Sequence, residues 1–284
     1  MIAGLLRVLR AARALPPRRH VSVTLGPHII GWVRSEQWHR LRAWPALFDA
    51  SELRIEIRPA EEPALSAAFA QVAQALAGEG VIRGWRGETY AVRASGSAKT
   101  LFHLERAAMR FFGFTAVAAH LNGFAGEGAA TCFHIARRAA TKSIDPGMLD
   151  NLVAGGVRSL EDAWQALVRE CGEEADIPAA LARTARPAGV LRVCEDASEG
   201  MHSETLHVYY LALPAGFAPR NTDGEVGEFL VLDAPALLER IAQGEMTVAA
   251  ALVTLEFASR RGALPDDGGK IRAAIEACRL PAPT

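Results

Sequence analysis

The segment GGVRSLEDAWQALVRECGEEADI, residues 155–177, constrains the fold of this chain more than any other stretch. Apolar residues recur through it at the spacing of one helix face: Ala163, Trp164, Leu167, Val168 and Cys171. That spacing predicts a helix packed on a sheet. On such a helix Glu170 lies over both Glu173 and Glu174, and each like-charged i,i+4 pair costs about 0.2–0.5 kcal/mol. The acids also fall near the negative end of the helix dipole, so the pattern indicates a compensating cation.

A bound metal ion explains this acidic cluster better than simple exposure to solvent. A solvent-exposed helix normally interleaves lysines four residues from its acids, whereas residues 159–177 contain no lysine and one arginine, Arg169. Carboxylate oxygens suit hard cations such as Mg²⁺ or Mn²⁺, with waters and substrate phosphates completing the coordination. Ser159 is the expected N-cap of the helix, with Asp162 three residues later. Gly172 inside the helix indicates close packing at that point.

The composition bounds the class of protein. The 284 residues are 50% hydrophobic and carry 31 basic and 32 acidic side chains. This suits a core of one large domain or two ordinary ones, and it provides no global charge for binding nucleic acid. No apolar run is long enough to span a membrane, so no membrane partner is expected. The cysteines never form C-x-x-C, and we expect reduced thiols in a cytoplasmic protein: Cys132, Cys171, Cys194 and Cys278.

The N-terminus is rich in arginine and has no acidic residue before Glu36. Its apolar residues keep helical spacing, which predicts an amphipathic helix that ends at Pro16-Pro17. A transit peptide and a helix lying on a membrane surface are the alternatives.

Periodicity along the chain predicts an α/β protein with two domains, a small α/β domain at residues 1–113 and a second domain at 114–284 with a mixed sheet between helices. Strands are expected at 21–33 (broken at Gly26-Pro27), 52–58, 88–94, 114–124, 130–138, 188–196, 204–213 and 228–232. Besides the acidic segment, helices are expected at 35–48, 63–80, 101–112, 234–243 and 246–261.

The polar residues of the acidic segment resemble the Nudix box, G-x5-E-x7-R-E-U-x-E-E-x-G-U, in which U is apolar. The matching positions are Gly155, Glu161, Arg169, Glu170, Glu173, Glu174 and Ile177. Asp176 stands where the family has Gly, and Asp tolerates the left-handed conformation expected after a helix. The resemblance implies an α/β/α Nudix sandwich and a Nudix diphosphohydrolase that uses Mg²⁺ or Mn²⁺.

By position, the resemblance also assigns roles to residues. It implies that Glu170, Glu173 and Glu174 are catalytic metal ligands and that the carbonyl of Ala154 is a further ligand.

Supporting residues follow from the same resemblance. Arg169 and Glu161 would orient the ligands through salt bridges. The family often draws another carboxylate from a later loop, and NTDGEVGEF at 221–229 offers Glu225 or Glu228 to polarise the attacking water or complete the metal shell. An ordinary turn is the alternative for that pair.

Basic residues upstream of the box are candidates for substrate binding. Arg138 and Lys142, followed by Pro-Gly, resemble the cations that grip a diphosphate in Nudix relatives, including isopentenyl diphosphate isomerases. Arg137 is a weaker candidate of the same kind. The isomerase activity itself is excluded, because the loop MLDNLVAGG lacks the Cys and His residues which that reaction needs.

Longer phrases resemble one Nudix subfamily, which has a conserved α/β N-terminal domain: GWRGETYAV, LERAAMRFFGF, HLNGF, PGMLDNLVAGG, RECGEEADIP and DGEVGEF. Its fungal and plant members act on thiamin diphosphate, preferentially on oxidised or damaged forms. The resemblance implies a small-molecule diphosphate substrate that is cleaved to the monophosphate and phosphate. Hydrolysis of nucleoside diphosphate derivatives such as ADP-ribose, a non-catalytic sensor of a diphosphate metabolite, and assembly as a homodimer stay open.

Overall fold

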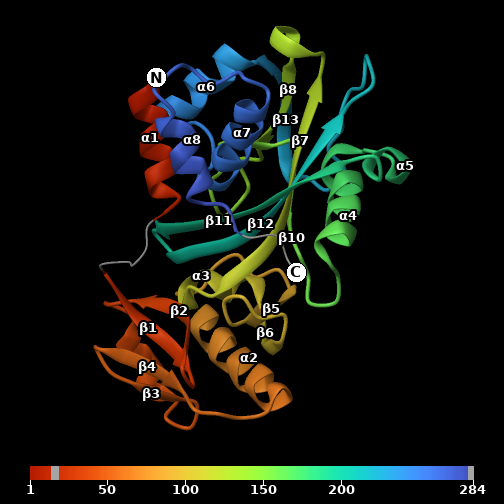
Figure 1. Cartoon of the computed structure of the whole chain (residues 1–284). Helices are drawn as coiled ribbons and strands as arrows, with labels where there is room; N and C mark the ends of the chain where they lie inside the picture. Colours follow the sequence, from red (N-terminus) through yellow and green to blue (C-terminus); the bar gives the residue numbers. More distant parts are fainter. Residues whose placement is uncertain (14–18, 281–284) are drawn as a thin grey trace.

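The computed structural model describes residues 1–13 and 19–280 and shows two lobes that meet at a waist (Figure 1). The N-terminal lobe comprises residues 19–112. The C-terminal lobe comprises residues 113–280 together with the first helix, α1 (Ile2–Ala11). Pro16-Pro17, expected to end that helix, lie outside the described residues.

The N-terminal lobe is built on a four-stranded sheet in the order β2-β1-β4-β3. Its strands are β1 (His20–Leu25), β2 (His28–Arg34), β3 (Phe48–Ala50) and β4 (Arg54–Ile57). Helix α2 (Glu62–Gly78) packs on this sheet, and β5 (Thr89–Arg93) and β6 (Thr100–Glu105) form a separate ribbon. Stacked and edge-on rings fill the core between them: Phe48, Phe69, Phe102, Phe112 and Phe114.

Two of the helix predictions for this lobe are wrong. Residues 35–48 form only a 3-10 turn at Trp38–Ala43, because Pro45 disfavours helical conformation in the residue before it. Residues 101–112 begin as strand β6, since Phe102 and Leu104 alternate inward with the period of a strand. Only a 3-10 turn (Arg106–Ala108) and the short α3 (Met109–Phe112) follow.

The C-terminal lobe contains a seven-stranded mixed sheet with β11-β12-β7-β8-β13 as its main path. Its strands are β7 (Thr115–Ala125), β8 (Cys132–Arg138), β9 (Leu149–Asn151), β10 (Val153–Gly156), β11 (Arg186–Ala197), β12 (Gly200–Ala212) and β13 (Val226–Asp233). Strand β7 runs parallel to β12 along one edge. Its other edge pairs first with β10 and farther along with β8, so the sheet divides between β10 and β8.

Helices cover both faces of this sheet (Figure 1). On one face lie α4 (Ala163–Ala175) and α5 (Ala179–Ala182), and on the other lie α6 (Ala234–Gln243), α7 (Val248–Arg260), α8 (Lys270–Glu276) and α1. Neighbouring residues of β7 serve opposite faces, with Ala118 in the α7 core and Ala119 in the α4 core. The expected α/β/α sandwich behind a small α/β lobe is confirmed.

Helix α1 is the amphipathic helix expected at the N-terminus, with Leu5, Val8 and Leu9 buried. These side chains pack against α6, α7 and α8 in the C-terminal lobe, although the helix precedes the other lobe in sequence. Gly4 allows the close approach, because a Cβ atom there would overlap the carbonyl of Ala242. The domain boundary at residue 113 therefore stays a prediction. Among the described helices, none has the length and apolarity to cross a membrane.

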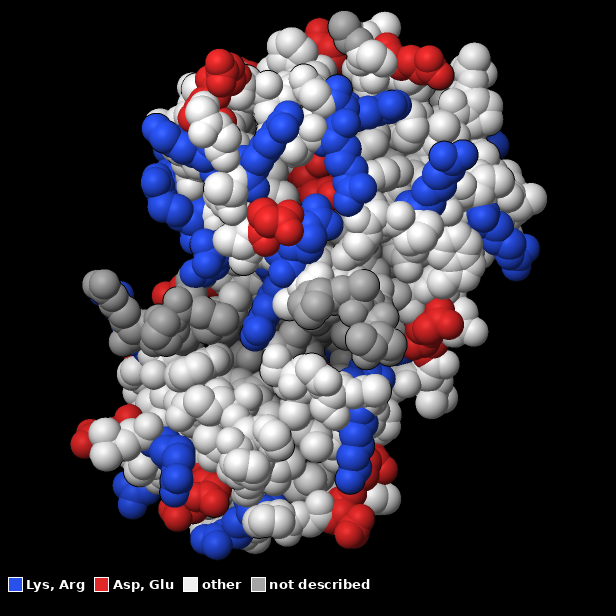
Figure 2. Space-filling model, in the orientation of Figure 1, with Lys and Arg blue, Asp and Glu red and all other residues white. Residues whose placement is uncertain are grey.

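Charged side chains are mixed on the face shown in Figure 2. Basic side chains gather over the helices of the C-terminal lobe, with acidic side chains among them. This arrangement agrees with a net charge of −1 for the whole chain.

Candidate functional site

Helix α4 begins at a capping box formed by Asp162 and Gln165. The Asp162 carboxylate accepts hydrogen bonds from the backbone N–H groups of Trp164 and Gln165 at 2.9 and 2.8 Å. The Gln165 side chain in turn accepts from the Asp162 N–H at 2.9 Å. The prediction that Ser159 is the N-cap is wrong, because its hydroxyl instead donates to the carbonyl of Thr89 in the N-terminal lobe. A carboxylate at the cap also has a favourable interaction with the helix dipole.

The C-terminal end of α4 is tied to the loop that contains Glu225. Asp176 follows the helix with φ 53°, the left-handed conformation expected for it. The backbone N–H and hydroxyl of Thr222 donate to the carbonyl of Glu173 at 3.2 and 2.6 Å. The close packing expected at Gly172 is wrong, because a Cβ atom added there would meet nothing within 4 Å.

Arg169 gathers the acids of the box. Its guanidinium donates to Glu161 at 2.6 and 3.1 Å, to Glu170 at 2.7 Å and to Glu173 at 2.9 Å. It also reaches the carbonyl of Gly156 on β10 at 3.2 Å. Arg169 and Glu161 thus lie where an orienting role requires them, although that role stays a prediction.

Two glutamates of α4 lie against strand β10, Glu174 buried and Glu170 half-buried. The backbone N–H of Ala154 donates to the Glu174 carboxylate at 2.9 Å, and Glu174 is only 8% exposed. Glu170 lies across Gly155, where any side chain would overlap its carboxyl group. Burial, followed by repulsion from Glu170, raises the pKa of Glu174 well above its ordinary value. Burial likewise raises the pKa of Glu170 despite the neighbouring charge of Arg169.

The donor chemistry of this helix fits a hard divalent cation, since a cation between Glu170 and Glu174 would remove both the repulsion and the penalty of burying charge. Among the described residues, no three His, Cys, Asp or Glu side chains are already gathered at metal-holding distances. Arg169 pairs with Glu170 and Glu173 in this arrangement. The ligand set with Glu173, Glu174 and the Ala154 carbonyl stays a prediction.

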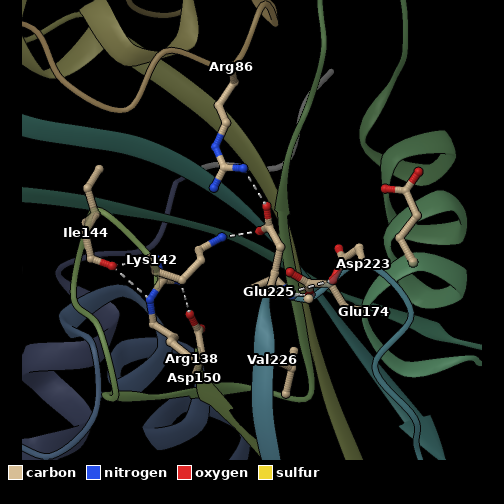
Figure 3. Close-up of polar contacts among 12 residues, drawn as sticks. Arg86, Arg138, Lys142, Ile144, Asp150, Glu174, Asp223, Glu225 and Val226 are labelled. Carbon is tan, nitrogen blue, oxygen red and sulfur yellow. Dashed lines mark hydrogen bonds and ion pairs between the residues drawn. The ribbon is translucent and has the colours of Figure 1, made fainter. Parts of the chain in front are cut away.

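Glu225 lies between two cations from different lobes (Figure 3). It is bonded to Lys142 of the C-terminal lobe and lies 3.3 Å from the Nη1 atom of Arg86 in the N-terminal lobe. Burial alone would raise the pKa of Glu225, but the hydrogen bond and charge of Lys142, and then the charge of Arg86, hold it below its ordinary value. Asp223 and Glu174 lie beside Glu225 in Figure 3. Glu225 is therefore an ionised carboxylate next to the glutamate helix.

The other predicted residues lie farther from that point. Glu228 is exposed on β13 and pairs with Arg137. Arg138 donates to the carbonyls of Ile144 and Asp145 and to the Asp150 carboxylate at 2.9 to 3.2 Å. Arg138 therefore shapes the loop after β8 and keeps few donors for a phosphate.

The N-terminal lobe grips the loop that leads into α4. Glu88 pairs with Arg158 of that loop at 2.8 Å and with Arg106 of its own lobe at 3.1 Å. The hydroxyl of Tyr90 lies against Gly156, where a Cβ atom would overlap it. The position of the box therefore depends on both lobes.

A cleft with a cavity volume of about 150 Å³, open to solvent, runs between the lobes. Its walls include Ala154 to Gly156 on one side and His202, Glu204 and Glu195 of β11 and β12 on the other. His202 donates to Glu204 at 3.0 Å and lies 3.7 Å from Glu195. Although burial acts in the opposite direction, His202 lowers the pKa of Glu204 to about 2, and Glu204 raises that of His202.

Sequence reasoning named Glu225 and Lys142 outside the box but missed other residues around it. These are Arg86, Glu88, Tyr90, His202 and Glu204. Arg86 to Tyr90 fall in the phrase GWRGETYAV. An arginine between two glycines, on a segment assigned to a separate domain, carried no sign that it faces the box.

Comparisons with known proteins agree with this geometry. Residues 115–252 match the NUDIX domain, and residues 7–116 match a domain of unknown function, DUF4743. The chain is 35% identical to Nudix hydrolase 20, chloroplastic, of Arabidopsis thaliana over 204 residues, which are 71% of this chain and 54% of that protein. It is 34% identical to Nudix hydrolase 24, chloroplastic, of the same plant, over 71% of this chain and 56% of that protein.

The chain thus spans about half the length of these curated relatives. A crystal structure of a Deinococcus radiodurans protein is similar, with 25% identity and a TM-score of 0.47 over 59% of this chain and 98% of that one. The box on α4 and the match of residues 115–252 lead to one conclusion: the second half of this chain is a Nudix domain.

Proposed function

We propose that the chain is a divalent-metal-dependent hydrolase that cleaves the diphosphate of an organic diphosphate to the monophosphate and phosphate. The observation that carries this proposal is the pair of half-buried Glu170 and buried Glu174, which lie together where their charges repel. Carboxylates with strongly raised pKa values cluster at functional sites. A diphosphate-bound metal ion is the partner that this pair suits best.

Mg²⁺ or Mn²⁺ is the proposed cofactor, with Glu170, Glu173, Glu174 and the Ala154 carbonyl as its holders. When bound, such an ion screens phosphate oxygens and lowers the pKa of a water molecule. Arg169 keeps two of the carboxylates in place through hydrogen bonds of 2.7 and 2.9 Å.

Glu225 is the proposed proton acceptor for the attacking water, at its carboxylate oxygens. Its lowered pKa keeps it ionised at neutral pH, as a general base must be. The tie from Thr222 to the end of α4 fixes this loop beside the glutamates. Glu228 is less well placed, because it is exposed and bonded to Arg137. Lys142 supplies a point charge for a phosphate oxygen, and Arg138 holds the loop that carries Lys142.

We further propose thiamin diphosphate or its oxidised analogues as the substrate. Strand β7 separates the two walls of the cleft, with β10 and the box on one side and β11 and β12 on the other. The carboxylate of Glu195 on the latter wall offers an acceptor to a cationic or amino-bearing ring. A ligand with a diphosphate at one end and such a ring at the other complements this polarity.

Phosphate release from a panel of diphosphates tests both levels of the proposal. The purified chain with Mg²⁺ is given thiamin diphosphate, an oxidised analogue and ADP-ribose, and the variants Glu173→Gln and Glu174→Gln are compared with wild type. Glu239→Gln is the matched control, because Glu239 on α6 bonds only Gln243 on its own helix. Turnover that persists in both box variants would falsify the metal-helix mechanism, and preference for ADP-ribose would replace the substrate.

A further inference from the structure

The arginines expected to bind phosphate in the C-terminal lobe already have partners. Arg137 bonds Glu228 and the carbonyl of Gly147, and Arg138 bonds two carbonyls and Asp150. Arg169 bonds the acids of the box. A diphosphate carries several negative charges, so binding it requires cationic side chains other than these three arginines.

The N-terminal lobe places one such cation at the site. Gly84 and Gly87 flank Arg86 with φ of 76° and 73°, so the loop makes two turns that glycine favours. A Cβ atom at Gly84 would lie 2.7 Å from the Ser143 hydroxyl, which shows how closely this loop approaches the loop that carries Lys142. Arg86 lines the cleft and points at Glu225 in Figure 3.

The contact that holds Arg86 is of the kind a ligand can replace. The ion pair is 3.3 Å long, and the Arg86 side chain is 39% exposed. Pairs as exposed as this one contribute little to stability. A phosphate offers the same guanidinium two oxygens in a bidentate geometry and more charge. Glu225 and a phosphate would therefore compete for the same two cations, Arg86 and Lys142.

We propose that Arg86 is a phosphate-binding residue supplied by the N-terminal lobe, and that Arg86 and Lys142 transfer from Glu225 to the diphosphate when it binds. The inference rests on the proposed function in one respect, that the ligand carries a diphosphate. Glu225 neutralises both cations in the structure, and its release couples diphosphate binding to the exposure of that carboxylate.

Calorimetric titration with inorganic pyrophosphate in the presence of a chelator tests this proposal without metal or turnover. Arg86→Gln is expected to weaken binding at least about tenfold. Arg40→Gln is the matched control, because Arg40 is 35% exposed on the same lobe and pairs with Glu79 at 2.6 Å. The pyrophosphate affinity of Arg40→Gln is expected to stay within about twofold of wild type. Thermal unfolding verifies that each variant is folded.

Glu225→Gln provides the sharper test, because a merely structural Arg86–Glu225 pair would not predict its result. Removal of the competing carboxylate is expected to tighten pyrophosphate binding about threefold or more, and Arg86→Gln in that background is expected to abolish most of the gain. The proposal is overturned by unchanged binding in Arg86→Gln, by weaker or unchanged binding in Glu225→Gln, or by wild type that binds no pyrophosphate at millimolar concentration.

The result also separates this inference from the proposed function. Pyrophosphate binding that depends on Arg86, in a chain that hydrolyses none of the diphosphates offered, would overturn the proposed function alone. Diphosphate turnover with an unchanged KM in Arg86→Gln would overturn the role of Arg86 alone.

Discussion

The two walls of the cleft each bury a glutamate, and the two glutamates differ in their partners. Glu204 on β12 lies 3.0 Å from His202, and its pKa falls to about 2. Glu174 on α4 has Glu170 as its charged neighbour, and its pKa rises well above the ordinary value. Burial disfavours the charged form of both carboxylates. The opposite directions of their pKa shifts therefore come from the sign of the neighbouring charge.

Glu204 has a cation in the chain itself, so its charge is already compensated in the folded protein. Glu174 has a like-charged neighbour instead, which suits the cation proposed for this site. Mutation of the two glutamates is therefore expected to have opposite consequences for stability.

The largest expected effect is on turnover in Glu174→Gln. Loss of one metal-binding carboxylate is expected to reduce phosphate release at least about 100-fold, since the ion contributes several kcal/mol to transition-state stabilisation. The metal-free variant is expected to unfold at the same or a higher temperature, because a repelling charge is gone while Gln still accepts from the Ala154 N–H. Clear destabilisation of Glu174→Gln in a calorimetric scan would show that Glu174 stabilises the fold as Glu204 does, and the contrast between the two would be wrong.

The next effect concerns stability in Glu204→Gln. Breaking the pair with His202 is expected to cost about 2 kcal/mol, less than a fully buried pair because Glu204 keeps some exposure. Urea denaturation at pH 6 measures this loss. Glu195→Gln is the control, because its longer 3.7 Å contact to the same histidine should contribute less. Equal losses in both variants would contradict the assignment of Glu204 as the main partner.

The stability difference between wild type and Glu204→Gln should also depend on pH. It is expected to be full between about pH 4.5 and 6.5, the ordinary pKa values of the two groups. It falls as the pH drops from 4.5 toward about 2, because Glu204 is protonated, and it falls above pH 6.5 as His202 loses its proton through its raised pKa. Arg110 and Glu195 also face this pair. A difference that stays constant from pH 3 to pH 8 would show that the pair is not ionised.

The smallest effect is expected at Gly172, which lies between the glutamates of α4. Because a Cβ atom there meets nothing, Gly172→Ala should stabilise the protein by about 0.5–1 kcal/mol through helix propensity alone. Turnover should stay within about twofold of wild type, since no contact of the site changes. A stabilised variant with lower turnover would indicate that the helix must bend to bring its glutamates together.

Long apolar elements could be predicted from the sequence. Strands β7, β8 and β12 are apolar runs, and helices α6 and α7 begin at the capping residues Asp233 and Thr247. Residues 101–112 could not, because the aromatic and aliphatic run LFHLERAAMRFF satisfies both periods and its pairing with β5 decides for a strand. Tertiary contact outweighs local propensity there.

The site was predictable where one segment contains it. The box and its arginine follow from spacing along a single helix, so Glu170, Glu173 and Arg169 could be grouped before any fold was known. The pairing of Arg86 with Glu225 could not, because 139 residues separate them (225 − 86) and only the meeting of two lobes joins them. Residue type favoured Arg138 as a phosphate-binding residue. The carbonyl groups that accept its hydrogen bonds are visible only in three dimensions.

The packing of α1 decides how this protein can be divided. The helix precedes the N-terminal lobe in sequence but completes the hydrophobic layer formed by α6, α7 and α8, so that lobe lies between two parts of one packed layer. A fragment that starts at Thr115 would leave the contacts of Leu5, Val8 and Leu9 bare, at a loss of about 1.5–3 kcal/mol for each side chain. A chimera that exchanges the C-terminal lobe between relatives must therefore exchange two separate segments, the first eleven residues and the segment that contains the last helices.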